Sequence, residues 1–340
     1  MPDVLAPPAV PAVHAQPVPR LSDLRAPVED HLAAFRTVFR EAMRSRVGLL
    51  DRVVQYVLKR KGKEIRPTLV LLSADMCGGV GPASYTAAAL VELLHTATLV
   101  HDDVVDEAES RRGAFSINAV WKNKIAVLLG DYLLSRGLLL ALDDKEYELL
   151  HTMSDAVRRM SEGELLQIET ARRLDITEET YFRIISDKTA SLISACMGAG
   201  AVSARADEET VALARDIGER LGLAFQIRDD LFDYDAIDVG KPTGLDLQDR
   251  KMTLPLITAL ANVDDGERRR VMRIVRKRKK SRAQIAEVIA FAHEAGGVAE
   301  ARRRMETLAA EASERLRSFP PSASRDALIG LCAYVVARKR

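Results

Sequence analysis

The chain has 340 residues, with 50 Lys and Arg against 49 Asp and Glu, so its formal net charge is only +1. This balance identifies no polyanionic partner, and we expect no nucleic-acid binding. Hydrophobic residues make up 47% but aromatic residues only 5%, a mixture that favours helices over sheets. No uninterrupted apolar run reaches membrane-spanning length. Cys77, Cys196 and Cys332 are too far apart in sequence to suggest a disulfide framework, which fits a reducing, cytoplasmic location.

The N-terminal segment differs in composition from the rest of the chain. Residues 1–20 hold six of the thirteen prolines, and they lack the basic start and compact apolar centre of a signal peptide. We interpret residues 1–25 as a disordered Pro/Ala-rich tail. Residues 26–340 are expected to form one domain.

Helical periodicity dominates the sequence from residue 26 onward. Apolar residues recur at three- and four-residue spacing through 83–101, 125–142, 147–168, 180–203 and 208–234. Strict alternation of apolar and polar residues is absent, so strands are not expected. Several helices are apolar around most of their circumference, which is typical of the centre of a bundle. The sequence therefore predicts an all-α, single-domain helical bundle around a central cavity.

Two aspartate clusters of identical form end apolar helical stretches in the two halves of the chain. They are Asp102-Asp103-x-x-Asp106 and Asp229-Asp230-x-x-Asp233. On a helix the first and last Asp of each cluster lie about 40° apart on one face. Gathered carboxylates are unfavourable without a cation, so we predict two oxygen-rich walls that hold Mg²⁺ and a phosphorylated substrate. A solvated acidic helix end would explain one cluster, but two copies favour the metal site.

Basic residues occur near the clusters in sequence. Arg111 and Arg112 follow the first cluster closely, and Lys188 interrupts an otherwise apolar stretch. The other candidates are Lys63, Arg66, Lys241 and Lys251. Each of these alone is more often a surface residue. Together they suggest guanidinium and ammonium groups that bind diphosphate oxygens which a metal leaves free.

With these motifs the chain resembles the trans-isoprenyl diphosphate synthases, the polyprenyl synthetase family, over about residues 30–340. The resemblance rests on Gly62-Lys63-x-x-Arg66-Pro67, Glu92-x-x-His95, both Asp clusters, Arg111-Arg112-Gly113, Gly163-Glu164-x-x-Gln167, Lys188-Thr189, Phe225-Gln226, Gly240-Lys241-Pro242 and Asp246-Leu247. It implies an isoprenoid-synthase fold and a homodimer packed through long helices.

The resemblance also implies residue roles. The six Asp residues would hold three Mg²⁺ on the diphosphate of an allylic substrate, helped by Arg111, Lys188, Lys241 and Lys251. Isopentenyl diphosphate would be bound by Lys63, Arg66, His95 and Arg112. Thr189 and Gln226 would stabilise the allylic carbocation. The residues assigned to catalysis itself are Asp102, Asp103, Lys188, Gln226 and Asp229.

The chain departs from the family pattern at two places. Members commonly have Gly directly before the lysine that follows the second cluster's loop, whereas Arg250 precedes Lys251 here. A proline is also common shortly after the Arg-Arg-Gly run, where this chain has Ala114-Phe115. The first departure concerns backbone geometry, and we expect little effect from the second.

Residues preceding the first cluster bear on product length. Members with short products carry Phe or Tyr at one of the positions held here by Ala97 and Thr98. Small residues leave the tunnel open, and the segment around Tyr132 resembles long-chain members. We therefore predict C35–C45 all-trans products, made from farnesyl or geranylgeranyl diphosphate for a quinone side chain.

Three alternatives remain open at this point. One is a short-chain geranylgeranyl or farnesyl diphosphate synthase. The second is a class I terpene cyclase, which would not need a second diphosphate site at Lys63, Arg66 and His95. The third is a non-catalytic subunit, which two intact Asp clusters disfavour.

A basic run, Arg268–Arg282, contains ten Lys or Arg residues and no acidic residue. It is interpreted either as a solvated basic helix or as a peripheral membrane contact. Nucleic-acid binding is the least favoured reading.

Overall fold

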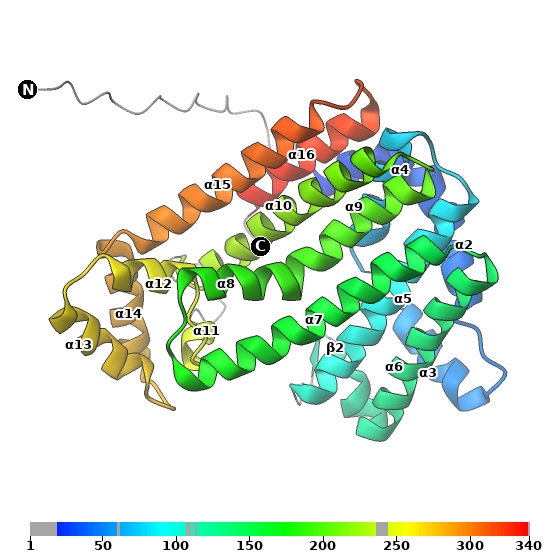
Figure 1. Cartoon of the computed structure of the whole chain (residues 1–340). Coiled ribbons are helices and arrows are strands. Elements are labelled where there is room, and N and C mark those ends of the chain that lie inside the picture. Colours follow the sequence, from blue (N-terminus) through cyan, green and yellow to red (C-terminus); the bar gives the residue numbers. More distant parts are fainter. Residues whose placement is uncertain (1–18, 60–61, 107–109, 112–113, 236–243, 339–340) are drawn as a thin grey trace, which may run out of the picture.

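The computed structural model describes residues 19–59, 62–106, 110–111, 114–235 and 244–338, and these are almost entirely helical (Figure 1). The predicted all-α class is confirmed. The expectation of no strands is wrong only for a minimal ladder, in which β1 (Ser110–Arg111) pairs antiparallel with β2 (Ala114–Phe115).

Within its described residues, the N-terminal half contains six α-helices and one short 3₁₀ helix. They are α1 (Leu21–Arg25), η1 (Ala26–Val28), α2 (Glu29–Ala42), α3 (Gly48–Leu58), α4 (Ile65–Cys77), α5 (Pro82–Val105) and α6 (Ile117–Asp143). The predicted helices over 83–101 and 125–142 correspond to α5 and α6. The predicted disordered tail extends too far, because residues 21–25 form α1, which buries Leu24 and packs near α16. Residues 1–18 lie outside the described residues.

The C-terminal half contains the remaining helices. They are α7 (Tyr147–Arg173), α8 (Glu178–Ile185), the π-helical turn η2 (Ser186–Ala190), α9 (Ser191–Ser203), α10 (Glu208–Phe232), α11 (Leu245–Gln248), α12 (Leu254–Ala261), α13 (Asp265–Val275), α14 (Arg282–Glu294), α15 (Gly297–Leu316) and α16 (Ala323–Ala337). The predicted helix over 180–203 is interrupted by η2. The basic run 268–282 is not one helix either, since α13 ends at Val275 and a non-helical link leads to α14.

The inner helix α9 packs against both α4 and α10, with α15 along α10 and α7 along α9 (Figure 1). Every residue of α9 except Ser194 is buried, which explains why its sequence is apolar on all sides. Gly200 allows α9 to pack closely on α4, because a Cβ built there would lie 2.4 Å from the Val70 carbonyl oxygen of α4. This core supports the ends of α5 and α10, where the aspartates lie.

Within the described residues, two helices are long and apolar enough to cross a membrane when only length and composition are considered, although neither is an uninterrupted apolar run. In α5 the most apolar window is 67% buried inside the protein, whereas in α6 it is 33% buried. The α5 helix is therefore a core helix. The α6 helix exposes an apolar face to the outside of this chain.

Candidate active site

Both aspartate clusters lie at the C-terminal ends of long helices. Asp106 is the C-cap of α5, and Asp233 is the C-cap of α10. The C-terminal end of a helix carries a partial negative charge, so carboxylates are unfavourable there unless cations offset them. The local structure thus strengthens the sequence argument for a bound cation at each cluster.

In the first cluster, Asp103 is only 3% exposed, whereas Asp102 and Asp106 are exposed. The carbonyl oxygen of Asp103 accepts a 3.1 Å hydrogen bond from the side-chain amide of Asn118, near the start of α6. This contact joins the end of α5 to the helix that follows the β1–β2 ladder. It leaves the carboxylates of Asp102 and Asp106 accessible from solvent.

In the second cluster, Asp230 is 6% exposed and its burial raises its pKa to about 7. Burial also raises the pKa of Asp229. Asp233 accepts a 2.6 Å hydrogen bond from the backbone N–H of Asp246, whose own pKa is raised to about 6 by burial and by the Asp233 carboxylate. Because ionising these groups is unfavourable without added positive charge, the donor set fits a hard divalent cation.

The carboxylates do not form a complete protein cage. Within the described part of the chain, no three His, Cys, Asp or Glu side chains come close enough together to enclose a metal ion. Mg²⁺ typically uses one or two carboxylates and completes its shell with water and substrate phosphates. An open carboxylate wall of this kind suits Mg²⁺ that arrives with a diphosphate.

The π-helical turn η2 carries Lys188 and Thr189, and two glycines let neighbouring helices approach it. A Cβ at Gly163 of α7 would lie 2.8 Å from the backbone nitrogen of Lys188, and one at Gly222 of α10 would lie 2.5 Å from the Ala190 Cα. π-Helical turns are frequent at functional sites because they displace the local hydrogen-bond pattern. Thr189 donates a 2.8 Å hydrogen bond to the Gln226 side chain, which links η2 to α10.

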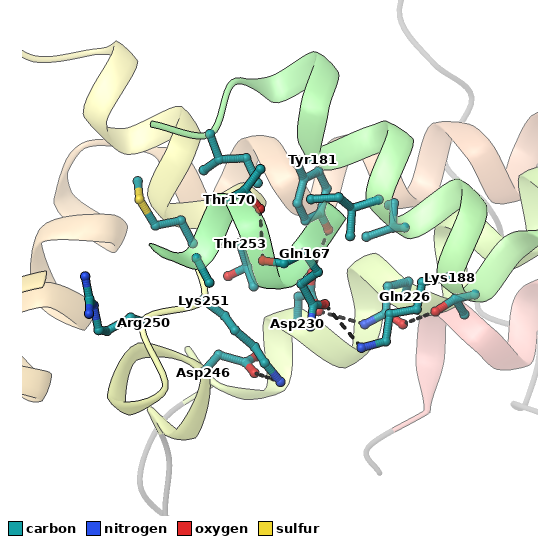
Figure 2. A pocket seen from close by; sticks show the side chains of 16 residues that line it. Gln167, Thr170, Tyr181, Lys188, Gln226, Asp230, Asp246, Arg250, Lys251 and Thr253 are labelled. Atoms are coloured by element: carbon teal, nitrogen blue, oxygen red, sulfur yellow. Dashed lines mark hydrogen bonds and ion pairs between the residues drawn. The ribbon is translucent and has the colours of Figure 1, made fainter. Parts of the chain in front are cut away.

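A cavity of about 120 Å³ lies between α7, α8, η2, α10 and the segment after α11 (Figure 2). Its lining includes the predicted Lys188, Thr189, Gln226, Asp230 and Lys251. The ammonium group of Lys188 pairs with Glu164 and lies 3.3 Å from Gln167, and that of Lys251 lies 3.9 Å from Asp246. In Figure 2, Arg250 lies on the side of the cavity opposite Lys188 and Gln226, and its side chain is directed away from Asp230. The ammonium groups of Lys188 and Lys251 and the carboxylates of Asp230 and Asp246 therefore line the same cavity.

The predicted residues of the second diphosphate site are only partly described. Lys63 is exposed and lies near enough to Asp229 to act against the rise in the pKa of that carboxyl group. Arg66 is in the first turn of α4, and His95 is buried in α5. Arg111 has a described backbone in β1, but its side chain, Arg112 and Lys241 lie outside the described residues. Convergence of these groups on one ligand remains a prediction.

The predicted chain-length residues lie on α5 and α6. Ala97 is 2% exposed and packs in an apolar cluster with residues of α2, α3 and α6, among them Met43, Val53 and Leu129. Thr98 donates to the backbone oxygen of His95 at 2.9 Å. Tyr132 donates at 2.6 Å to the backbone oxygen of Arg44, so it fastens α6 to the end of α2.

Tyr181 and Arg338 contact the second cluster and were not among the predicted site residues. Tyr181 donates a 2.6 Å hydrogen bond to Asp230, and Arg338 pairs with Asp229 while its guanidinium lies 3.9 Å from the Phe225 ring centroid. A lone Tyr at apolar helical spacing looks like a core residue in the sequence. The Arg338 contact spans 109 residues, which no local pattern reveals.

Comparison with known proteins agrees with this geometry. The family model described as polyprenyl synthetase matches residues 47–292. Octaprenyl diphosphate synthase of Escherichia coli is 37% identical over 311 residues, covering 91% of this chain and 96% of that protein. The structure of a decaprenyl diphosphate synthase from Rhodobacter capsulatus superposes with a TM-score of 0.88 at 36% identity, over 94% of this chain and 100% of that one. The structure of a polyprenyl synthase from Caulobacter crescentus, complexed with calcium and isoprenyl diphosphate, superposes with a TM-score of 0.86 at 31% identity. This match covers 96% of this chain and 100% of that one.

Proposed function

The chain belongs to the polyprenyl synthetase family, and we propose that it condenses isopentenyl diphosphate with an allylic diphosphate to make a long-chain all-trans polyprenyl diphosphate. The observation that carries this proposal is the cavity lined by Lys188, Lys251, the buried carboxylate of Asp230 and the half-buried carboxylate of Asp246. Such a mixture suits a ligand that brings both phosphate oxygens and divalent cations.

The first chemical step is ionisation of the allylic substrate. Lys188 and Lys251, with Arg111 and Lys241 as further predicted contacts, bind the leaving diphosphate and stabilise the negative charge that grows as the C–O bond breaks. The hydroxyl of Thr189 and the amide of Gln226 place polar groups beside the resulting allylic cation. Their mutual hydrogen bond holds both groups in one orientation.

Mg²⁺, three ions per active site by family resemblance, would be held by Asp102, Asp103 and Asp106 on one wall and by Asp229, Asp230 and Asp233 on the other. When bound, it supplies Lewis-acid neutralisation of the diphosphate charge. The calcium-bound relative from Caulobacter crescentus supports a divalent ion in this site.

The second step joins the two substrates. Lys63, Arg66, His95 and Arg112 hold isopentenyl diphosphate so that its double bond attacks the allylic cation. Loss of a proton then regenerates an allylic diphosphate that is five carbons longer. A terpene cyclase needs no such second diphosphate site, and a non-catalytic subunit needs no intact aspartates.

The direct test incubates purified protein with MgCl₂, radiolabelled isopentenyl diphosphate and farnesyl or geranylgeranyl diphosphate, followed by chromatography of the products. We expect C35–C45 products, and none after chelation with EDTA. Asp229→Asn should lower turnover by orders of magnitude, whereas Asp175→Asn, in the link before α8, should not. Products that stop at C15 or C20 would support the short-chain alternative, and no product with any primer would reject the proposal. Expression of this chain in a quinone-deficient host would test the quinone role, because a quinone-chain synthase should restore growth.

We also propose a homodimer formed through α6. The residues Val120, Val127, Leu128, Leu139 and Leu142 are exposed large apolar side chains along this helix. Lys122, with φ +70°, interrupts α6 after Val120. In the helix beyond it, Val127, Leu128, Leu139 and Leu142 fall within about one third of the circumference at 3.6 residues per turn. Exposed Asp131 and Ser135 lie on the same face. A helix face with several exposed large apolar side chains is typical of a surface covered by another subunit.

A cytoplasmic location with peripheral membrane contact is the remaining part of the proposal. Arg276, Lys277, Arg278 and Lys279 are exposed in the link between α13 and α14, so the basic run forms a compact cationic surface. Juxtaposed cations of this kind gain about 1 kcal/mol each at an anionic lipid surface. Co-sedimentation with vesicles containing phosphatidylglycerol should be strong at low salt and lost at high salt. Absence of binding to these vesicles at low salt would favour a solvated basic surface.

A further inference from the structure

The hydroxyl group of Tyr181 forms an unusually enclosed contact with the second aspartate cluster. It donates a 2.6 Å hydrogen bond to Oδ2 of Asp230, and Tyr181 itself is only 3% exposed. The two residues come from different helices, α8 and α10. Water cannot readily replace the phenol at this position because both partners are buried, so Tyr181 fixes one side of the carboxylate.

The other oxygen of the same carboxylate is fixed from its own helix. The side-chain amide of Gln226 donates to Oδ1 of Asp230 at 2.9 Å. The Gln226 carbonyl oxygen in turn accepts a 2.8 Å hydrogen bond from Thr189 of η2. Three hydrogen bonds thus run from α8 through α10 to the π-helical turn, and Figure 2 shows Tyr181, Asp230 and Gln226 directed toward one another.

We propose that Tyr181 is a positioning residue for the cation site. Each carboxylate oxygen has two lone pairs, so one donor on each oxygen orients Asp230 and leaves a lone pair on each for a metal or its water. The same contacts hold Gln226 and Thr189 toward the reacting carbon. This role rests on the proposed function only where it assigns Asp230 to the Mg²⁺ wall.

A purely structural role for Tyr181 predicts a different outcome, and Tyr234 supplies the matched control. Tyr234 is completely buried, and its hydroxyl accepts a 3.3 Å hydrogen bond from Thr253 rather than binding an aspartate. Tyr181→Phe and Tyr234→Phe each remove one buried hydroxyl. Only Tyr181→Phe leaves an oxygen of Asp230 without its donor.

The test measures cation binding without catalysis. Thermal unfolding is followed while MgCl₂ is titrated at a fixed concentration of inorganic pyrophosphate. Removing an outer partner of a metal ligand weakens metal binding by about 10- to 100-fold, so the half-maximal MgCl₂ concentration should rise about tenfold for Tyr181→Phe. It should stay at the wild-type value for Tyr234→Phe. Superposable curves for wild type and Tyr181→Phe would overturn the proposal.

Two further measurements separate the remaining cases. If Tyr181→Phe yields too little folded protein, Gln226→Met removes the other donor to Asp230 and should raise the MgCl₂ requirement as well. In synthase assays, Tyr181→Phe should shift the MgCl₂ activation curve while the KM for isopentenyl diphosphate stays unchanged. A wild-type protein that makes no polyprenyl product but shows the Tyr181-dependent shift with pyrophosphate would reject the proposed function and retain this inference.

Discussion

The backbone N–H of Lys251 donates a 2.8 Å hydrogen bond to the carbonyl oxygen of Asp246, and this bond closes a turn around Arg250. Arg250 has φ +63°, and its own N–H donates to the Leu247 carbonyl oxygen at 3.2 Å. Together the two bonds form the left-handed helix ending that usually has glycine at its centre. The family's common glycine is therefore replaced without loss of the backbone geometry that positions Lys251.

Arg250→Gly should consequently stabilise the protein. A left-handed conformation costs a non-glycine residue about 1–2 kcal/mol, and the greater freedom of glycine in the unfolded chain cancels about 0.5–1 kcal/mol of that gain. We expect the free energy of unfolding to rise by about 0.5–1 kcal/mol in urea denaturation. Synthase activity should be unchanged, because Arg250 is directed away from Asp230.

The matched control is Arg250→Ala, which removes the same guanidinium but keeps the Cβ. It should give no stabilisation. Equal stabilisation by both variants would show that the side chain, and not the backbone conformation, is the source of the cost.

Gly222→Ala tests the close packing of α10 on the π-helical turn. The added Cβ would lie 2.5 Å from the Ala190 Cα, and backbone atoms cannot move aside cheaply. Overpacking of this kind costs about 1–3 kcal/mol, and the shift of η2 should also displace Thr189. We expect lower thermal stability together with at least a tenfold loss of kcat. Gly48→Ala is the control, because nothing lies within 4 Å of the added Cβ. Retention of full kcat in a Gly222→Ala protein with a lowered melting temperature would contradict this account.

Sequence periodicity predicts the helices well where apolar spacing is regular, as in α5, α6, α7 and α10. It cannot predict η2, because the π-helical turn depends on Gly163 and Gly222 of two other helices, which lie far from η2 in the chain. Residues 21–25 were predicted to be disordered from the Pro/Ala-rich composition of the N-terminal segment. They form α1 because this short helix packs against the C-terminal helix α16, a contact that composition does not reveal.

The residues of the candidate site likewise divide into those that the sequence predicts and those that only the fold brings together. Aspartate clusters and lysines are visible because their charge is unusual in apolar sequence. Tyr181 and Arg338 act through long-range contacts, so only the folded chain reveals them. Arg111, Arg112 and Lys241 keep their predicted roles, since the structure does not describe their side chains.

The exposed apolar side chains of α6 yield a prediction about assembly. A Leu128→Asp/Leu139→Asp variant places two charges on side chains that are exposed in the single chain, so the monomer fold should tolerate them. In an interface the same charges would be desolvated without partners. Light scattering should show a dimer for the wild type and a monomer for the variant. Ala290→Asp, on the exposed face of α14, should leave the dimer intact. A variant that remains dimeric would place the interface elsewhere.

Ala97→Phe tests the proposed control of product length. Ala97 is one of the smallest side chains in the apolar cluster between α2, α3, α5 and α6, and Leu93 lies one turn before it on α5. A growing prenyl chain must displace or thread between such side chains, and a phenyl ring at residue 97 would block that path about one turn below Asp102. We expect the main product to shorten to C15–C20, as measured by chromatography of dephosphorylated radiolabelled product.

The control is Ala312→Phe, at an equally buried position on α15. It should lower stability by a comparable amount, about 1–3 kcal/mol, without altering product length. Because both variants are overpacked, a change in length confined to Ala97→Phe reports the path of the chain and not a loss of stability. Unchanged length in Ala97→Phe would mean that the product grows along another face of α5.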